Sequence, residues 1–217
     1  MANSKKILLT GFAPFGGEVS NPSWEAVKQL DGAGIKGHTV HAREMAVVFG
    51  HSNKQLRAWL RELKPALIIC VGQAGGRSTM SLERVAINVD DARIPDNAKQ
   101  QPIDQPIVDA GPAAYFTTLP IKAMLRDMRA AGVPVSISQT AGTFVCNHVF
   151  YGLMHALRSR RQVRGGFIHI PFSPEQAATH SNAPSMSIPD VIKGLRVGIA
   201  TCLTTSQDVS VAGGAEH

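Results

Sequence analysis

Short apolar runs alternate with amphipathic segments along most of the chain. The runs are rich in Leu, Ile and Val, which is typical of strands buried on both faces of a parallel sheet. We predict strands over residues 6–10, 38–46, 67–71, 133–138 and 166–170. Because helical segments separate these strands, the pattern predicts an α/β fold, a single-domain, three-layer α/β/α structure with a largely parallel twisted sheet.

The helical segments show an apolar face and recognisable ends. Asn21 followed by Pro22 is an N-cap with proline at the first helical position, and Ser187 precedes the last helix in the same way. Gly132 and Pro134 end a helix before the fourth strand. We expect helices over residues 23–30, 56–63, 121–128, 146–157 and 187–203.

The organisation of the chain suggests one domain over residues 1–205 and a flexible tail over residues 206–217. Residues 81–111 are rich in Asp, Pro, Asn and Gln, and a loop of that length suggests a functional or interface role. No apolar run approaches the roughly 18 residues that span a membrane. The first residues are also too short for a secretory signal, so we expect a cytoplasmic protein with no membrane partner.

Composition and charge change this picture little. Hydrophobic residues make up 44% of the chain and charged residues 18%, as in ordinary globular proteins. The net charge is +6, and the densest basic group, residues 158–164, lies where a helix is expected to end. Such a group is typical of a solvated helix end, and no nucleic-acid-binding motif accompanies it. We therefore expect no nucleic acid partner.

The three cysteines, Cys70, Cys146 and Cys202, form neither a CxxC motif nor an even set. This argues against a disulfide scaffold and a structural zinc site, so we expect neither a metal nor a cofactor. Cys70 lies in an apolar strand and Cys202 in the last helix, which suggests structural roles for both.

Cys146 is different because it follows a strand and a turn of small residues and falls in the first turn of a predicted helix. Free backbone N–H groups and the helix dipole favour an anion there. We therefore expect the pKa of its thiol to lie below the usual value of about 8.5. A small buried core residue is the alternative, and this segment alone leaves both interpretations open.

A nucleophilic thiol needs a base and an orienting acid. His169 lies at the end of a buried strand just before Pro171, and sites in parallel sheets form at strand carboxyl ends. It could equally be a core histidine bonded to backbone. Glu83 is a carboxylate in an apolar setting, although an ion pair with Arg84 or a surface lysine would also explain it. Spacing does not decide between these interpretations.

Two glycine-rich stretches, residues 11–17 and 72–77, also follow predicted strands. Neither matches a dinucleotide fingerprint or a P-loop, and turn formation is a sufficient explanation for both. Their position still matters, because strand-end loops at Phe12, Gln73 and Phe144 could converge on one pocket.

Taken together, several segments resemble one family of enzymes. They are LLTGFAPFGG (8–17), NPSWE (21–25), ERVAINVDDARIPDN (83–97), SQTAGTFVCNH (138–148) and HIPF (169–172). In order and over nearly the whole chain, they resemble pyroglutamyl peptidase I, a family of cysteine peptidases. The resemblance implies removal of N-terminal pyroglutamate (5-oxoproline) from peptides through a thioester acyl-enzyme. It also implies a cytoplasmic location and a homo-oligomer, specifically a tetramer.

The resemblance assigns roles residue by residue. It implies Cys146 as nucleophile, His169 as base and Glu83 as orienting acid. It implies a substrate pocket built from six further residues, which are Phe12, Phe15 and Phe144 around the ring, Gln73 at the ring amide, Asn21 as a support of the first loop, and Arg84 at the oxyanion.

Two other classes of function remain as alternatives. A nucleoside-phosphorylase-like α/β enzyme would show phosphate-dependent cleavage and indifference to thiol reagents. A non-catalytic or RNA-binding relative, suggested by the net positive charge, would show salt-sensitive nucleic-acid binding and no turnover. Neither explains why Glu83, Cys146 and His169 all lie in matching motifs.

Overall fold

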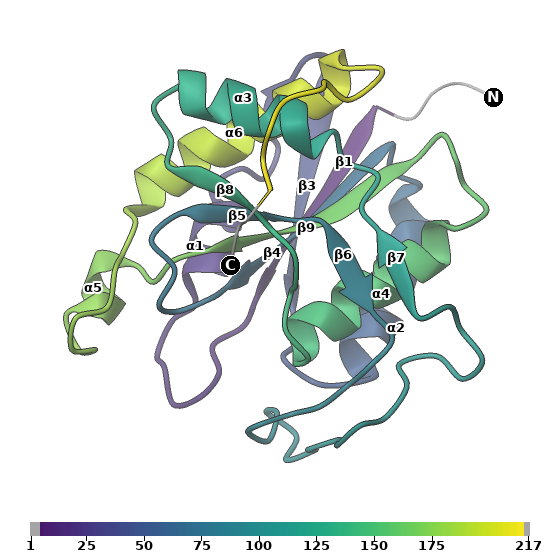
Figure 1. Ribbon diagram of the computed structural model, residues 1–217, viewed down its shortest axis with the longest axis vertical. Helices are drawn as coiled ribbons and strands as arrows, with labels where there is room; N and C mark the ends of the chain where they lie inside the picture. The colour runs from purple at the N-terminus through teal and green to yellow at the C-terminus, as the bar shows by residue number, and fades with distance from the viewer. Residues whose placement is uncertain (1–4, 215–217) are drawn as a thin grey trace.

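The computed structural model describes residues 5–214, and its centre is a seven-stranded sheet with helices on both faces (Figure 1). In spatial order the strands are β2 (Gly34–Ile35), β3 (His38–Met45), β1 (Lys6–Phe12), β4 (Leu67–Gln73), β9 (Arg164–Ile170), β5 (Met80–Glu83) and β8 (Val135–Ser138). A separate two-stranded ribbon joins β6 (Val85–Ile87) to β7 (Ala114–Phe116). The prediction of an α/β fold is confirmed.

Strand direction divides the sheet into two parts. Strands β3, β1, β4 and β9 are parallel to one another, and the short edge strand β2 is antiparallel to β3. Strand β5 is antiparallel to β9, and β8 is parallel to β5, so both run against the main group. The sheet is thus largely parallel, as predicted, but the loop before the Cys146 helix begins on a reversed strand.

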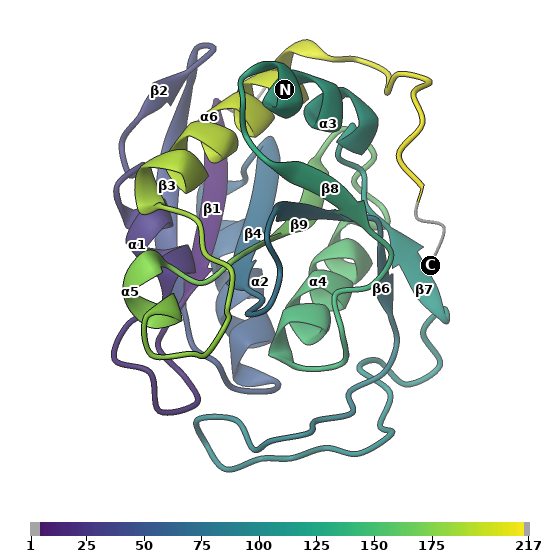
Figure 2. The same cartoon turned by 60° about the vertical axis from the view of Figure 1, so that its left-hand side comes forward.

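The helices form two outer layers (Figure 2). Helices α1 (Pro22–Lys28), α3 (Ile121–Ala130) and α6 (Ile188–Thr204) cover one face, and α2 (His51–Leu63) and α4 (Val145–Leu157) cover the other. The short α5 (Pro174–Ala177) lies beyond the end of β9.

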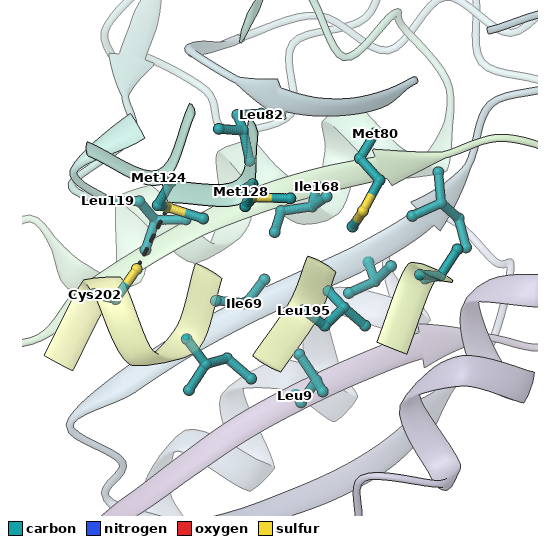
Figure 3. Packing of buried hydrophobic residues seen from close by; sticks show 14 of the residues in the cluster. Leu9, Ile69, Met80, Leu82, Leu119, Met124, Met128, Ile168, Leu195 and Cys202 are labelled. Carbon is teal, nitrogen blue, oxygen red and sulfur yellow. Dashed lines mark hydrogen bonds between the residues drawn. The ribbon is translucent and has the colours of Figure 1, made fainter. Parts of the chain in front are cut away.

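Alternate residues of each strand supply the two layers. Leu9, Ile69 and Ile168 pack with Leu195 of α6 (Figure 3), whereas the intervening Phe167 faces the α2 and α4 side. This is the two-residue period of a sheet buried on both faces.

Capping residues begin the helices where the sequence predicted. The side chain of Asn21 accepts from Ser23 N at 3.0 Å, and that of Ser187 accepts from Asp190 N at 3.2 Å. Each cap satisfies a backbone N–H that has no partner inside its helix.

The polar stretch over residues 81–111 is not simply a loop. It begins within β5, contains β6 and then runs as a hydrogen-bonded strap. Asp91 N donates to Thr143 O at 3.0 Å, so the strap contacts the segment just before α4. The pattern missed β5 because Ser81 and Glu83, both buried, interrupt its apolar residues.

The described part of the tail lies against α3. Asp208 accepts from the backbone N of Lys122 at 3.1 Å and of Ala123 at 2.8 Å, at the start of that helix. Residues 215–217 of the predicted tail lie outside the described residues. Within residues 5–214, no helix is long and apolar enough to cross a membrane.

Candidate active site

Cys146 is the second residue of α4, whose N-cap is Phe144. Its Sγ lies against the backbone of Gly72 on β4, since a Cβ added to Gly72 would lie 2.9 Å from that sulfur. Gly72 is in register with His169 on β9. The thiol therefore lies over the ends of β4 and β9. Cys146 as a residue is partly exposed, whereas Cys70 and Cys202 are buried.

The structure brings His169 and Glu83 together. Nδ1 of His169 lies 2.8 Å from Oε1 of Glu83, and both side chains are almost completely buried. The antiparallel register places Ser81 opposite His169, so Glu83, two residues further along β5, lies on the same face of the sheet. A carboxylate at this nitrogen fixes the imidazole with Nδ1 protonated and Nε2 free to act as a base.

A residue that the sequence analysis missed completes this cluster. Arg77, in the loop between β4 and β5, places NH1 2.6 Å from Oε1 of Glu83 and donates from NH2 to Thr140 O at 3.2 Å. Nothing in the pattern distinguishes Arg77 from the glycine-rich turn that contains it, apart from its position six residues before Glu83.

The protonation of the cluster differs from the prediction. Burial raises the pKa of the Cys146 thiol to about 12, and the charge of Glu83 raises it further, against a lowering by Arg77. Burial also lowers the pKa of His169, partly opposed by its hydrogen bond to Glu83. The predicted lowering of the thiol pKa at a helix start is therefore wrong, because loss of hydration outweighs it. Both shifts favour the uncharged forms, a neutral thiol and a neutral imidazole.

A narrow apolar cleft opens beside the thiol. It is lined by Phe12, Phe15, Asn21, Val47, Gln73, Phe144, Val145 and Cys146, and its volume is about 10 Å³. The ring centroids of Phe15 and Phe144 are 6.3 Å apart, and Phe49 meets Phe144 edge-on at 5.4 Å. This volume holds about one water molecule.

Asn21 has a structural part in the cleft as well as lining it. Its Nδ2 donates to Ala13 O at 3.1 Å, and its Oδ1 accepts from Ser23 Oγ at 2.7 Å. Ser23 Oγ in turn accepts from Phe12 N at 2.9 Å. Asn21 thereby fixes the start of α1 against the loop that carries Phe12 and Phe15.

Gln73 is oriented by Gln176, a second residue that the sequence analysis missed. Gln176 Oε1 accepts from Ser173 N at 3.3 Å, in a capping box that starts α5. Its Nε2 therefore faces three acceptors, among them Glu18 Oε2 and Gln73 Oε1, both at 3.2 Å. If the side-chain amide of Gln73 were flipped, its Nε2 would face Nε2 of Gln176, and two donors would oppose each other. Oε1 of Gln73 therefore faces Gln176, and Nε2 of Gln73 is left for a ligand in the cleft.

A second histidine–carboxylate pair supports the wall of the cleft. Nδ1 of His148 lies 2.7 Å from Oδ2 of Asp90, and its Nε2 accepts from Gly50 N at 2.9 Å. The ring of His148 meets Phe49 edge-on at 5.4 Å, and Phe49 packs against Phe144. As expected from its spacing, His148 points away from the thiol.

The structure does not bring Arg84 into the cleft. Its backbone N donates to Ser138 O at 2.9 Å, and its Nε is buried without a hydrogen-bond partner among the described residues. In that same part of the chain, no group of three His, Cys, Asp or Glu side chains forms a candidate metal site.

A thiol, a buried imidazole and a buried carboxylate at one end of an α/β sheet are the groups that a cysteine hydrolase needs. Residues 5–205 match the model of the family described as pyroglutamyl peptidase. The chain belongs to the pyroglutamyl peptidase family.

Relatives agree with this assignment over their full length. A pyrrolidone-carboxylate peptidase from Cupriavidus pinatubonensis is 62% identical over 98% of this chain and 100% of its own. One from Klebsiella pneumoniae is 59% identical over 97% of this chain and 99% of its own. The alternative of a nucleoside-phosphorylase-like enzyme is not supported.

Solved structures extend the likeness to the fold. The pyroglutamyl peptidase I from Bacillus amyloliquefaciens is 48% identical, with a TM-score of 0.93 over 96% of this chain and 100% of its own. A mutant pyrrolidone carboxyl peptidase from Pyrococcus furiosus is 42% identical, with a TM-score of 0.87 over 91% of this chain and 98% of its own.

Proposed function

We propose that the protein removes N-terminal pyroglutamate from peptides through a thioester acyl-enzyme, with Cys146 as nucleophile, His169 as base and Glu83 as orienting acid. Family membership supports the reaction. The observation that carries the residue assignment is the buried pair of His169 and Glu83, 2.8 Å apart, beside the thiol of Cys146, a residue that is partly exposed.

The mechanism follows from the neutral forms of the thiol and the imidazole. His169 removes the proton of the Cys146 thiol as its sulfur attacks the carbonyl that joins pyroglutamate to the next residue. Backbone N–H groups in the first turn of α4 stabilise the oxyanion. The imidazolium then protonates the leaving amine, and neutral His169 activates water to hydrolyse the thioester. Glu83 stabilises the imidazolium in both steps.

The cleft suits an uncharged lactam. The aromatic walls would leave a free N-terminal ammonium without hydration, whereas an uncharged lactam needs only hydrogen-bond partners for its amide. Nε2 of Gln73 is available to donate to the 5-oxo group, because Oε1 is held by Gln176. A prolyl residue lacks that carbonyl and would leave the amide unpaired, which disfavours it strongly.

The test is hydrolysis of a fluorogenic pyroglutamyl amide by the wild type and Cys146→Ser, beside the matching prolyl and glutamyl amides. Turnover of the pyroglutamyl compound alone, abolished in the variant, would support both reaction and nucleophile. No turnover by a folded, reduced wild type would refute the assignment.

Location, assembly and domain limits belong to the same proposal. We infer a cytoplasmic homotetramer, in which a reducing environment keeps the three cysteines free; light scattering and cell fractionation test this. We also infer that residues 1–205 suffice for catalysis. Truncation after Thr205 should retain kcat but lower the Tm, because α3 loses the cap that Asp208 supplies.

A further inference from the structure

Glu83 has two partners on a single oxygen. Nδ1 of His169 lies 2.8 Å from Oε1 and NH1 of Arg77 lies 2.6 Å from the same atom. Oε2 of Glu83 is buried and has no hydrogen-bond partner among the described residues. The position of the carboxylate therefore depends on two donors that approach Oε1 from different elements, β9 and the β4–β5 loop.

The charges of the two donors are not equivalent. In the resting state burial lowers the pKa of His169, so its imidazole is neutral and cannot balance the carboxylate. Glu83 is completely buried, and a buried charge is costly unless it is paired. The guanidinium of Arg77 supplies the opposite charge at 2.6 Å.

Arg77 also connects the carboxylate to the segment that leads into the nucleophile helix. Its NH2 donates to Thr140 O at 3.2 Å. The same carbonyl accepts from Ser138 Oγ at 2.9 Å, at the end of β8. One planar side chain thus holds Glu83 on β5 and the turn between β8 and α4, and its fixed fork suits this better than an ammonium would.

We propose that Arg77 is a positioning residue of the active site, which holds Glu83 against His169 and fixes the turn before Cys146. The proposal rests on the function proposed above. It adds a fourth side chain, outside the triad, that acts through the carboxylate and does not touch substrate.

A pH dependence follows from this placement. The charged groups that act on His169 are Glu83 from β5 and Arg77 from the β4–β5 loop. The same two groups and Cys70 of β4 act on the thiol of Cys146. The charge of Arg77 lowers the pKa of both His169 and Cys146. Removal of the Arg77 charge should raise the pKa of His169 and of Cys146. Because catalysis needs neutral His169, the loss of activity on the acid side should begin at a higher pH than in the wild type.

The test compares Arg77→Met, Arg77→Lys and a distant control, Arg126→Gln, whose side chain is half exposed and pairs with Asp127. Each variant is assayed for kcat and KM on the pyroglutamyl amide between pH 5 and 9. The rate of Cys146 alkylation by iodoacetamide is measured over the same range, because it requires no substrate. Circular dichroism and Tm establish that each variant is folded.

We expect Arg77→Met to move the acid limb of kcat/KM upward by about one pH unit and to lower kcat by about 10- to 100-fold with little change in KM. Arg77→Lys should restore the acid limb but only part of kcat, and Arg126→Gln should match the wild type. The alkylation profile of Arg77→Met should shift in the same direction.

The outcomes distinguish a failure of the Arg77 proposal from a failure of the proposed function. Absence of pyroglutamyl turnover in the wild type would refute the function but leave the alkylation profile as a test of Arg77. The positioning role would be overturned if folded Arg77→Met showed no shift in the acid limb of kcat/KM and none in the alkylation profile. It would also be overturned if kcat fell equally at every pH and Arg77→Lys did not restore it. If Arg77→Met does not fold, the kcat of Arg77→Lys is the test. Lysine keeps the charge but lacks the planar guanidinium, so the proposal requires a lower kcat in this variant.

Discussion

The two faces of the sheet are built from the same strands but bury different chemistry. Along β5, Met80 and Leu82 enter the apolar layer under α3 and α6, while Ser81 and Glu83 face the other side. On the α6 side burial is favourable for nearly every group, at about 25 cal/mol per Å² of apolar surface. On the α4 side the sheet also buries a carboxylate and an imidazole, at a cost to stability.

The comparison shows that burial alone does not identify the function of a strand. Phe167 and Ile168 are adjacent on β9 and equally buried, yet one lies against the ring of His169 and the other in the apolar layer. Substitutions on the α4 side should therefore change catalysis more than stability, and substitutions on the α6 side the reverse.

The largest expected effect is that of Glu83→Gln. An amide at this position can donate to Nδ1 of His169 and so favour the wrong tautomer. We expect kcat/KM to fall by about 10⁴-fold, measured on protein whose folded state is checked by circular dichroism. Activity within tenfold of the wild type would mean that Glu83 does not orient His169.

Leu195→Ala should show the opposite behaviour. Leu195 is fully buried in the α6 layer (Figure 3) and does not line the cleft. Its truncation should lower the free energy of unfolding by about 2–5 kcal/mol, measured by urea denaturation. Because the thiol side is untouched, kcat per folded molecule should be unchanged, and a large loss of kcat would remove the distinction between the faces.

Phe144→Ala should have an intermediate effect on catalysis. Loss of this wall of the cleft should lower kcat/KM by about 10- to 100-fold, while iodoacetamide still alkylates Cys146. Phe116→Ala is the matched control, since Phe116 is 69% exposed on β7. If Phe144→Ala abolishes alkylation as well, the defect lies in folding and not in ring recognition.

The smallest effect concerns a pair of thiols, one on each face. Burial raises the pKa of Cys70 and of Cys202 to about 12. The unfolded chain releases these protons near the ordinary value of about 8.5, so the contribution to stability is full below that pH and is lost as pH rises toward 12.

As the pH rises from 8.5 to 9.5, each thiol should therefore lower the free energy of unfolding by about 1 kcal/mol. Urea denaturation at both pH values should show a smaller decrease for Cys202→Ala than for the wild type. Equal decreases would show that Cys202 does not titrate differently in the folded and unfolded chains.

Much of the fold was predictable because its signals are local. Strands β4 and β9 are continuous apolar runs, and Asn21 and Ser187 are caps that act within their own helix turns. The start of α4 at Val145, one residue before the predicted start at Cys146, follows from the same local rules.

The remainder depends on contacts between distant residues. Strand β5 was missed because Ser81 and Glu83 are polar where the pattern expects apolar residues, and their burial makes sense once His169 is opposite. The sign of the Cys146 pKa shift was wrong because helix position is visible in sequence and burial is not. Arg77 acts through Glu83, and no motif of its own marks it. Gln176 lies in a capping box with Ser173, a motif that predicts a helix start but not the contact with Gln73.

The position of β5 between β9 and β8 has a consequence for folding kinetics. Glu83 and His169 are 86 residues apart in sequence, and their hydrogen bond forms once β5 is inserted between β9 and β8. Pairings of such long range are slow to form because a large loop must close first. Recovery of enzymatic activity after dilution from denaturant should thus lag behind recovery of helical signal, and the interval between the two reports the insertion of this strand.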